Sequence, residues 1–238
     1  MWQRLPDTGG LKSMNKIEDA FKNKKAFIPF VTAGDPSLDV TRELILAMQE
    51  AGADLIEIGI PFSDPVAEGP VIQEADDRAL SAGVTTDKIF DMVDDIADKI
   101  HVPIVFMTYI NPIYVYGVEK FAKRAKACGA AGVIVPDVPF EEKEEIRGSF
   151  EAEGLVVISM VAPTSADRVR MIAKEAKGFL YCVSSLGVTG VRTEIGTAIG
   201  DLIQTVKEEC SIPCAIGFGI STPEQAEAMA KISDGAIV

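Results

Sequence analysis

The chain has 238 residues, 47% of them hydrophobic and 25% charged, which is a globular composition with room for one large domain or two small ones. It holds 23 Lys and Arg against 36 Asp and Glu, and its net charge of −13 argues against binding to nucleic acid or to an anionic membrane. No apolar run approaches the roughly 18 residues that a membrane-spanning helix needs, and the first residues lack the apolar core of a signal peptide.

Eight short apolar runs alternate with amphipathic segments along the chain. Each run is rich in Val, Ile or Phe, and such continuous apolarity is typical of strands in a sheet that is covered on both faces. The eight predicted strands are 27–32, 55–60, 104–109, 132–137, 155–161, 179–184, 214–217 and 235–238.

Helical periodicity fills the segments between these strands. Val40, Leu44, Ala47 and Ala51 recur at helical spacing and predict the buried face of the first helix. Similar stripes run through 89–100, 118–128 and 195–206. Ser221 with Glu224 predicts a capping box at the start of a late helix.

This alternation predicts an α/β fold, a single (β/α)8 TIM barrel, with a doubly wound open sheet as the alternative. We expect residues 14–238 to form the barrel and residues 1–13 to be an N-terminal extension outside the fold. Because the chain stops at Val238, inside the eighth predicted strand, the barrel is expected to lack its last helix. The long loops 60–70 and 185–196 both follow strand ends, on the face where barrel active sites lie.

Cysteine and histidine are too few to suggest a metal site or a nucleophilic triad. The cysteines Cys128, Cys182, Cys210 and Cys214 form no Cys-x-x-Cys pair, and His101 is the single histidine. We therefore expect reduced thiols in a cytoplasmic protein, no metal and no cofactor. Any proton chemistry must then come from carboxylates.

Glu57 is the strongest catalytic candidate. It lies in the middle of a predicted strand, where alternation places it with Leu55 and Gly59, while Ile56 and Ile58 face the helices. Glu57 should therefore point into the barrel, where desolvation raises the pKa of a carboxyl group toward a value useful for giving and taking a proton. The alternative is a buried glutamate paired with Lys or Arg.

Other candidates lie at strand ends and in the long loops. Ser63, Asp64 and Glu68 stand in a loop rich in proline, which is either a solvated turn or an arm holding a second carboxylate over the barrel mouth. Glycine turns at 187–190 and 217–219 could bring backbone amides to a phosphate. Core packing is the default interpretation of Phe30, Met160 and Phe218, which could otherwise line an apolar pocket; Tyr109 and Tyr181 accompany strand ends.

These segments together resemble the tryptophan synthase alpha chain family. The motifs that carry the resemblance are Phe27-Ile-Pro-Phe-Val-Thr-Ala-Gly-Asp-Pro, Leu55-Ile-Glu-Ile-Gly-Ile-Pro-Phe-Ser-Asp-Pro-Val-Ala-Glu-Gly-Pro, Val135-Pro-Asp-Val-Pro, Gly187-Val-Thr-Gly and Gly217-Phe-Gly-Ile-Ser. The resemblance implies a barrel that cleaves indole-3-glycerol phosphate to indole and glyceraldehyde 3-phosphate. It also implies a beta-chain partner in an alpha2-beta2 heterotetramer, which condenses the indole with serine using pyridoxal phosphate.

The resemblance also implies roles for single residues. Glu57 matches the general acid/base of the family, and Glu68 stands where the family usually has Asp, a substitution that moves the charge by about 1 Å. The substrate-binding positions are Phe30, Tyr109, Met160, Tyr181, Phe218 and Thr189, the last on the lid; Gly190 and Gly219 match phosphate-binding amides; Pro61 and Asp64 match the partner interface.

Three other functions stay open on the sequence. A stand-alone lyase would release free indole without a partner. The chain could also be an activating binding subunit with weak chemistry, because Glu68 replaces the usual Asp. A phosphate-binding isomerase is compatible with Glu57 and the glycine turns alone, although the long loop 60–70 argues against it.

Overall fold

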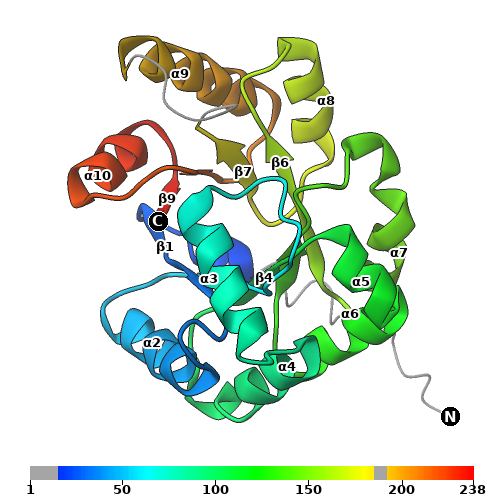
Figure 1. Ribbon diagram of the computed structural model, residues 1–238. Helices are drawn as coiled ribbons and strands as arrows, with labels where there is room; N and C mark the ends of the chain where they lie inside the picture. Colours follow the sequence, from blue (N-terminus) through cyan, green and yellow to red (C-terminus); the bar gives the residue numbers. More distant parts are fainter. Residues whose placement is uncertain (1–15, 185–191) are drawn as a thin grey trace, which may run out of the picture.

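The computed structural model describes residues 16–184 and 192–238. Parallel strands alternate with helices along the chain, and the helices surround the strands as an outer layer (Figure 1). The strands are β1 (Ala26–Ile28), β2 (Phe30–Thr32), β3 (Ile56–Gly59), β4 (Ile104–Met107), β5 (Gly132–Ile134), β6 (Val156–Val161), β7 (Leu180–Val183), β8 (Cys214–Gly217) and β9 (Gly235–Ile237). The α-helices are α2 (Leu38–Glu50), α3 (Pro70–Ser81), α4 (Thr86–Asp94), α5 (Ile110–Tyr116), α6 (Val118–Ala127), α7 (Glu144–Ala152), α8 (Ala166–Glu175), α9 (Arg192–Glu209) and α10 (Pro223–Ile232). The 3₁₀ turns are η1 (Ala97–Lys99) and η2 (Phe140–Glu142).

The sheet closes into a barrel because β1 and β2 are two halves of one predicted strand, interrupted at Pro29, which has no N–H to donate. The strand order is β1-β9-β8-β7-β6-β5-β4-β3-β2, so that β1 pairs with β9 at one end of this order and β2 pairs with β3 at the other. In Figure 1 the blue β1 lies beside the red β9. The predicted (β/α)8 barrel is confirmed, with β1 and β2 together forming one of its eight strands, and the open sheet is excluded.

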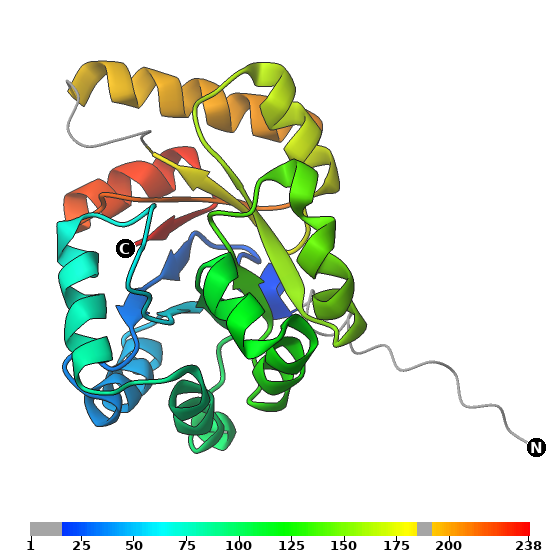
Figure 2. The ribbon, with the colours of Figure 1, turned by 45° about the vertical axis from the view of Figure 1, so that its right-hand side comes forward.

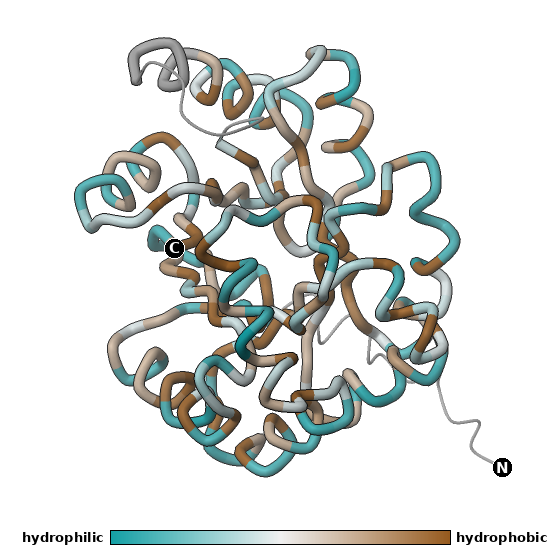
Figure 3. The backbone as a smooth tube through the Cα atoms, viewed as in Figure 1, coloured by the Kyte–Doolittle hydropathy of each residue, from teal (hydrophilic) through white to brown (hydrophobic). Residues whose placement is uncertain are grey.

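Strand alternation divides the core into an inner and an outer layer. Ile56, Ile58 and Ile60 pack outward with the helices, whereas Leu55 and Val105 pack inside the barrel. In Figure 3 hydrophobic and hydrophilic residues alternate along the outer helices, as expected for helices that pack one face on the strands. Turning the molecule shows the helices standing around the strands (Figure 2). Within the described residues, no helix is long and apolar enough to cross a bilayer.

The predicted face of the first helix is wrong. In α2 Val40 and Leu44 are 36% and 37% exposed, and the buried residues are Thr41 and Ile45. The Thr41 hydroxyl accepts the Gly34 N–H at 2.9 Å and donates to the Ser37 carbonyl at 3.0 Å. These bonds tie Thr41 to the end of the preceding loop and set the rotation of the helix. The stripes over 89–100 and 118–128 do lie on buried or partly buried faces.

The predicted capping box is displaced by one residue. The box of α10 joins Thr222 and Gln225, not Ser221 and Glu224. The Thr222 hydroxyl accepts the Gln225 backbone N–H at 3.3 Å, and the side-chain Oε1 of Gln225 accepts the Thr222 backbone N–H at 3.2 Å. Pro223 decides this position, because proline at the first helical position makes the preceding residue the N-cap.

Candidate active site at the barrel mouth

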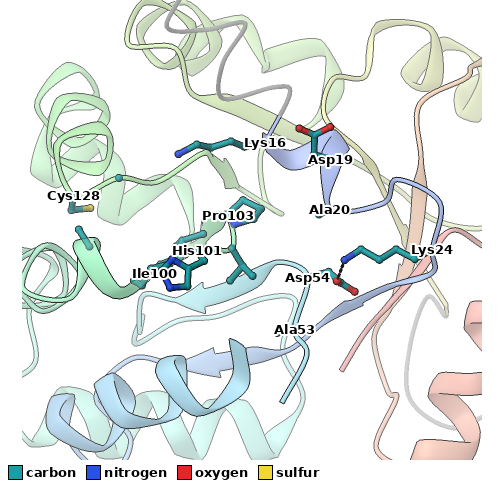
Figure 4. Close-up of a pocket in the computed structure, with 14 residues that line it drawn as sticks. Lys16, Asp19, Ala20, Lys24, Ala53, Asp54, Ile100, His101, Pro103 and Cys128 are labelled. Atoms are coloured by element: carbon teal, nitrogen blue, oxygen red, sulfur yellow. Dashed lines mark hydrogen bonds and ion pairs between the residues drawn. The ribbon is translucent and has the colours of Figure 1, made fainter. Parts of the chain in front are cut away.

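The barrel has a hollow at each end, and they differ in chemistry. At the C-terminal ends of the strands a cavity of about 1390 Å³ is lined by Glu68, Met160 and Phe218, among others. At the opposite end a smaller cavity of about 440 Å³ contains the Lys24–Asp54 ion pair (Figure 4). Asp54 also accepts the Phe27 N–H at 2.9 Å, so its charge serves the fold. The candidate catalytic groups lie at the C-terminal end.

Glu57 occupies the inner face of β3 and is 1% exposed. Burial raises the pKa of its carboxyl group to about 8, and the negative charge of Glu68 adds to the increase. Its Oε2 has no hydrogen-bond partner among the described residues. The paired alternative therefore fails, since no Lys or Arg forms an ion pair with Glu57 in the described part of the chain.

Glu68 reaches the same mouth from the loop between β3 and α3. Burial raises the pKa of its carboxyl group to about 7, with a further contribution from the charge of Asp76. The Tyr109 hydroxyl donates to Glu68 Oε2 and accepts the Ala67 N–H at 3.0 Å. The Phe62 ring packs against Tyr109, with their centroids 5.4 Å apart. The loop is therefore an arm that holds a second carboxylate in place.

Two glycines make room for aromatic side chains inside the barrel. A Cβ at Gly59 would lie 2.6 Å from the Phe30 ring, and one at Gly217 would lie 2.3 Å from the Tyr181 hydroxyl oxygen. Tyr181 is 5% exposed, and burial, together with the charge of Glu57, raises the pKa of its hydroxyl well above the usual value. Phe30, Tyr181, Met160 and Phe218 belong to one inner cluster, so the structure brings these four predicted residues together.

The remaining predicted residues lie in three places: at the barrel mouth, on the arm, and outside the described residues. Gly219 follows β8 with φ +71°, a left-handed conformation that suits glycine, and its N–H has no acceptor among the described residues. Of the two predicted interface residues, Asp64 is exposed and Pro61 is buried. Thr189 and Gly190 lie outside the described residues.

Sequence reasoning missed Asp76, whereas Asp137, at the end of a predicted strand, has the turn-forming role that its position favours. Asp76 lies in α3, is 5% exposed, and burial raises the pKa of its carboxyl group to about 6. Its neighbours Glu74 and Asp77 make it look like part of a solvated acidic face, so only tertiary burial identifies it. Asp137 accepts the Ile110 N–H at 2.9 Å, at the start of α5. Its turn-forming role is therefore sufficient to explain it.

Comparison with known proteins decides the family. The family model of the tryptophan synthase alpha chain matches residues 17–238. The chain belongs to the tryptophan synthase alpha chain family.

Both the sequence relatives and the solved structures agree with this family assignment. The tryptophan synthase alpha chain of Halalkalibacterium halodurans is 49% identical over 227 residues, which cover 94% of this chain and 86% of that protein. The alpha chain of Lacticaseibacillus casei is 48% identical over 225 residues, covering 94% and 85%. The crystal structure of tryptophan synthase subunit alpha from Legionella pneumophila str. Paris superposes with a TM-score of 0.84 at 38% identity, covering 97% and 85%.

Membership of this family identifies the reaction that the protein catalyses. As a tryptophan synthase alpha chain, the protein is a lyase of tryptophan biosynthesis that cleaves indole-3-glycerol phosphate. An isomerase is therefore excluded. Two carboxyl groups with raised pKa values, buried Glu57 and half-buried Glu68, lie at the barrel mouth.

Proposed function

We propose that Glu57 is the general acid and base of the cleavage and that Glu68 holds the indole ring nitrogen. The observation that carries this proposal is the presence at the barrel mouth of buried Glu57 and half-buried Glu68, whose carboxyl pKa values are raised to about 8 and about 7. Burial raises the pKa of Glu57 further than that of Glu68, so Glu57 retains its proton to higher pH than Glu68 does. This difference gives each carboxyl group a different role.

The reaction balances with one proton entering the substrate and one leaving it. Protonated Glu57 gives its proton to indole C3, and positive charge develops on the ring, whose N–H donates to ionised Glu68. The hydroxyl on the carbon attached to C3 then loses its proton to Glu57. Its C–O bond becomes a carbonyl as the C–C bond breaks, and the bonding electron pair returns to the ring. The products are indole and glyceraldehyde 3-phosphate.

The inner aromatic cluster supports a place for the indole, and the glycine turn a place for the phosphate. Phe30, Tyr181 and Phe218 provide flat apolar surface next to Glu57. The N–H of Gly219, which has no acceptor among the described residues, offers a donor at the end of β8, where barrel phosphate sites lie. Thr189 and Gly190 would contribute from the loop after β7, as a lid and as a second phosphate-binding amide.

We also propose that a beta chain docks over the arm. Three large apolar side chains are strongly exposed near the mouth: Val66 at 80%, Val71 at 76% and Val115 at 81%. They lie on the arm, on the first turn of α3 and on α5, beside the exposed Asp64. A patch of this kind is typical of a protein–protein interface, and buried Pro61 would support it from beneath. The four free cysteines fit a reducing, cytoplasmic location.

The function is tested by measuring indole release from indole-3-glycerol phosphate with and without a tryptophan synthase beta chain. We expect release that increases when the beta chain is added. Val115→Asp should reduce this increase and leave the basal rate unchanged, because it places a charge on an exposed side chain of α5 that does not line the cavity. Ile232→Asp, at the end of α10 and 39% exposed, is the matched control and should behave as wild type.

Other outcomes identify the alternatives. A high basal rate that the beta chain does not alter would indicate a stand-alone lyase. Activation of the beta chain by a folded alpha chain that releases no indole would indicate a binding subunit and would contradict the proposed chemistry.

A series at Glu68 tests its role separately. We expect Glu68→Ala to lower kcat/KM by about 100-fold, because the developing charge on the ring loses its partner. Glu68→Asp should stay close to wild type, since a carboxylate remains near the indole nitrogen. Steady-state rates for the two variants check this, and a fully active Glu68→Ala variant would refute the role.

A further inference from the structure

Two buried polar atoms inside the barrel have no partner within the described residues. The described part of the chain leaves three such side-chain atoms: Thr32 Oγ1, Arg42 Nε and Glu57 Oε2. Arg42 lies on α2 in the outer layer, and its other nitrogens pair with aspartates. Thr32 and Glu57 are 5% and 1% exposed. Because proteins rarely leave buried polar atoms unpaired, this pair points to a polar ligand.

Strand register places the two side chains close together on the inner face. Phe30 pairs with Glu57 and Thr32 pairs with Gly59, so Thr32 lies diagonally across from Glu57 and one step nearer the mouth. Alternation puts Thr32 on the same face as Phe30, since Val31 packs in the outer layer. Gly59, opposite Thr32, has no side chain that could use the hydroxyl, and the Phe30 ring packs against it.

The order of strands around the barrel matches the order of groups in the substrate. Glu57 is on β3, Thr32 is on β2, and Gly219 follows β8, which β1 and β9 connect to β2. In the substrate the reacting hydroxyl comes first, a second hydroxyl follows on the next carbon, and the phosphate is last. Thr32 therefore lies between the group that removes the proton and the proposed phosphate donor.

Resting on the proposed function, we propose that the Thr32 hydroxyl binds the second, non-reacting hydroxyl of the glycerol chain. A threonine hydroxyl can donate and accept, which suits an alcohol ligand. Glu57 Oε2 would accept from the neighbouring reacting hydroxyl. Vicinal hydroxyls would thus satisfy both unpaired atoms at once, and Thr32 would make the site specific for a diol.

The experiment measures the activity of two Thr32 variants on each of two substrates. Thr32→Val removes the hydroxyl with little change in shape, and Thr32→Ser retains it. The second substrate is the analogue of indole-3-glycerol phosphate that lacks only the non-reacting hydroxyl; it keeps the hydroxyl that cleavage requires. Indole release is measured for each combination, together with the melting temperature of each protein.

We expect Thr32→Val to lower kcat/KM on the natural substrate roughly tenfold, the effect of one lost hydrogen bond, and to leave kcat/KM on the analogue unchanged. Thr32→Ser should remain close to wild type on both. The melting temperature of Thr32→Val should not fall, because the removed hydroxyl makes no hydrogen bond to any described residue.

Two results would overturn the assignment. An equal loss on both substrates would make Thr32 a structural residue, and no loss on either would remove it from the site. A wild-type protein that releases no indole from either substrate would instead contradict the proposed function, so the two failures are distinguishable.

Discussion

Glu57→Gln is expected to lower indole release by about 1000-fold or more. Glutamine keeps the size and hydrogen-bonding shape of the side chain but can neither give a proton to indole C3 nor take one from the glycerol hydroxyl, and positioned acid–base groups contribute about 10²–10⁴-fold each. Steady-state indole release, with and without a beta chain, measures the loss. Both proton transfers depend on this one carboxyl group, so the variant should not be rescued at any pH.

The control for this loss of activity is a measurement of how well Glu57→Gln binds the substrate. Glu57→Gln should still bind indole-3-glycerol phosphate, because the aromatic cluster and the glycine turn after β8 are unchanged. Calorimetric titration of the variant with substrate checks that the site is intact. A Glu57→Gln protein that retains more than a tenth of the wild-type rate would assign the acid–base role to another residue.

The same substitution is expected to stabilise the protein, by an amount that depends on pH. The pKa of Glu57 in the folded chain, about 8, is above the ordinary value of 4.5, so the folded state holds the proton more tightly than the unfolded state does. This contribution to stability is fully present below about pH 4.5 and is lost as pH rises through about 8. Glutamine resembles the protonated form and avoids the loss.

The free energy of unfolding should therefore be similar for the two proteins near pH 4, and Glu57→Gln should be the more stable by up to about 4 kcal/mol near pH 8, at about 1.4 kcal/mol per pH unit. Urea unfolding across this range measures the difference. Glu141 provides a control of opposite sign, because the Arg168 guanidinium lowers its pKa to about 2. Glu141→Gln should lower stability above pH 4.5. A constant difference between Glu57→Gln and wild type would show that the carboxyl group is not desolvated.

The predicted fold follows from local patterns and was recovered well. Eight continuous apolar runs between helical segments are sufficient to predict a parallel barrel, because strands covered on both faces leave this pattern wherever they occur. The orientation of the first helix was not recoverable in the same way. Hydrogen bonds of Thr41 to the preceding loop, rather than the apolar stripe through Val40 and Leu44, decide which side of α2 is buried.

Some features of the candidate site were likewise predictable from local sequence patterns, and others were not. Strand alternation alone turned Glu57 inward, since a period of two residues fixes the face of every side chain in a strand. The sequence by itself thus determined the barrel, its inward glutamate and the glycines near the mouth. Only the tertiary structure decided that Tyr109 donates to Glu68, 41 residues away, that Asp76 is buried, and that the Thr32 hydroxyl has no partner in the described part of the chain. These properties depend on contacts between distant segments and on the exclusion of water, neither of which leaves a periodic signal in the chain.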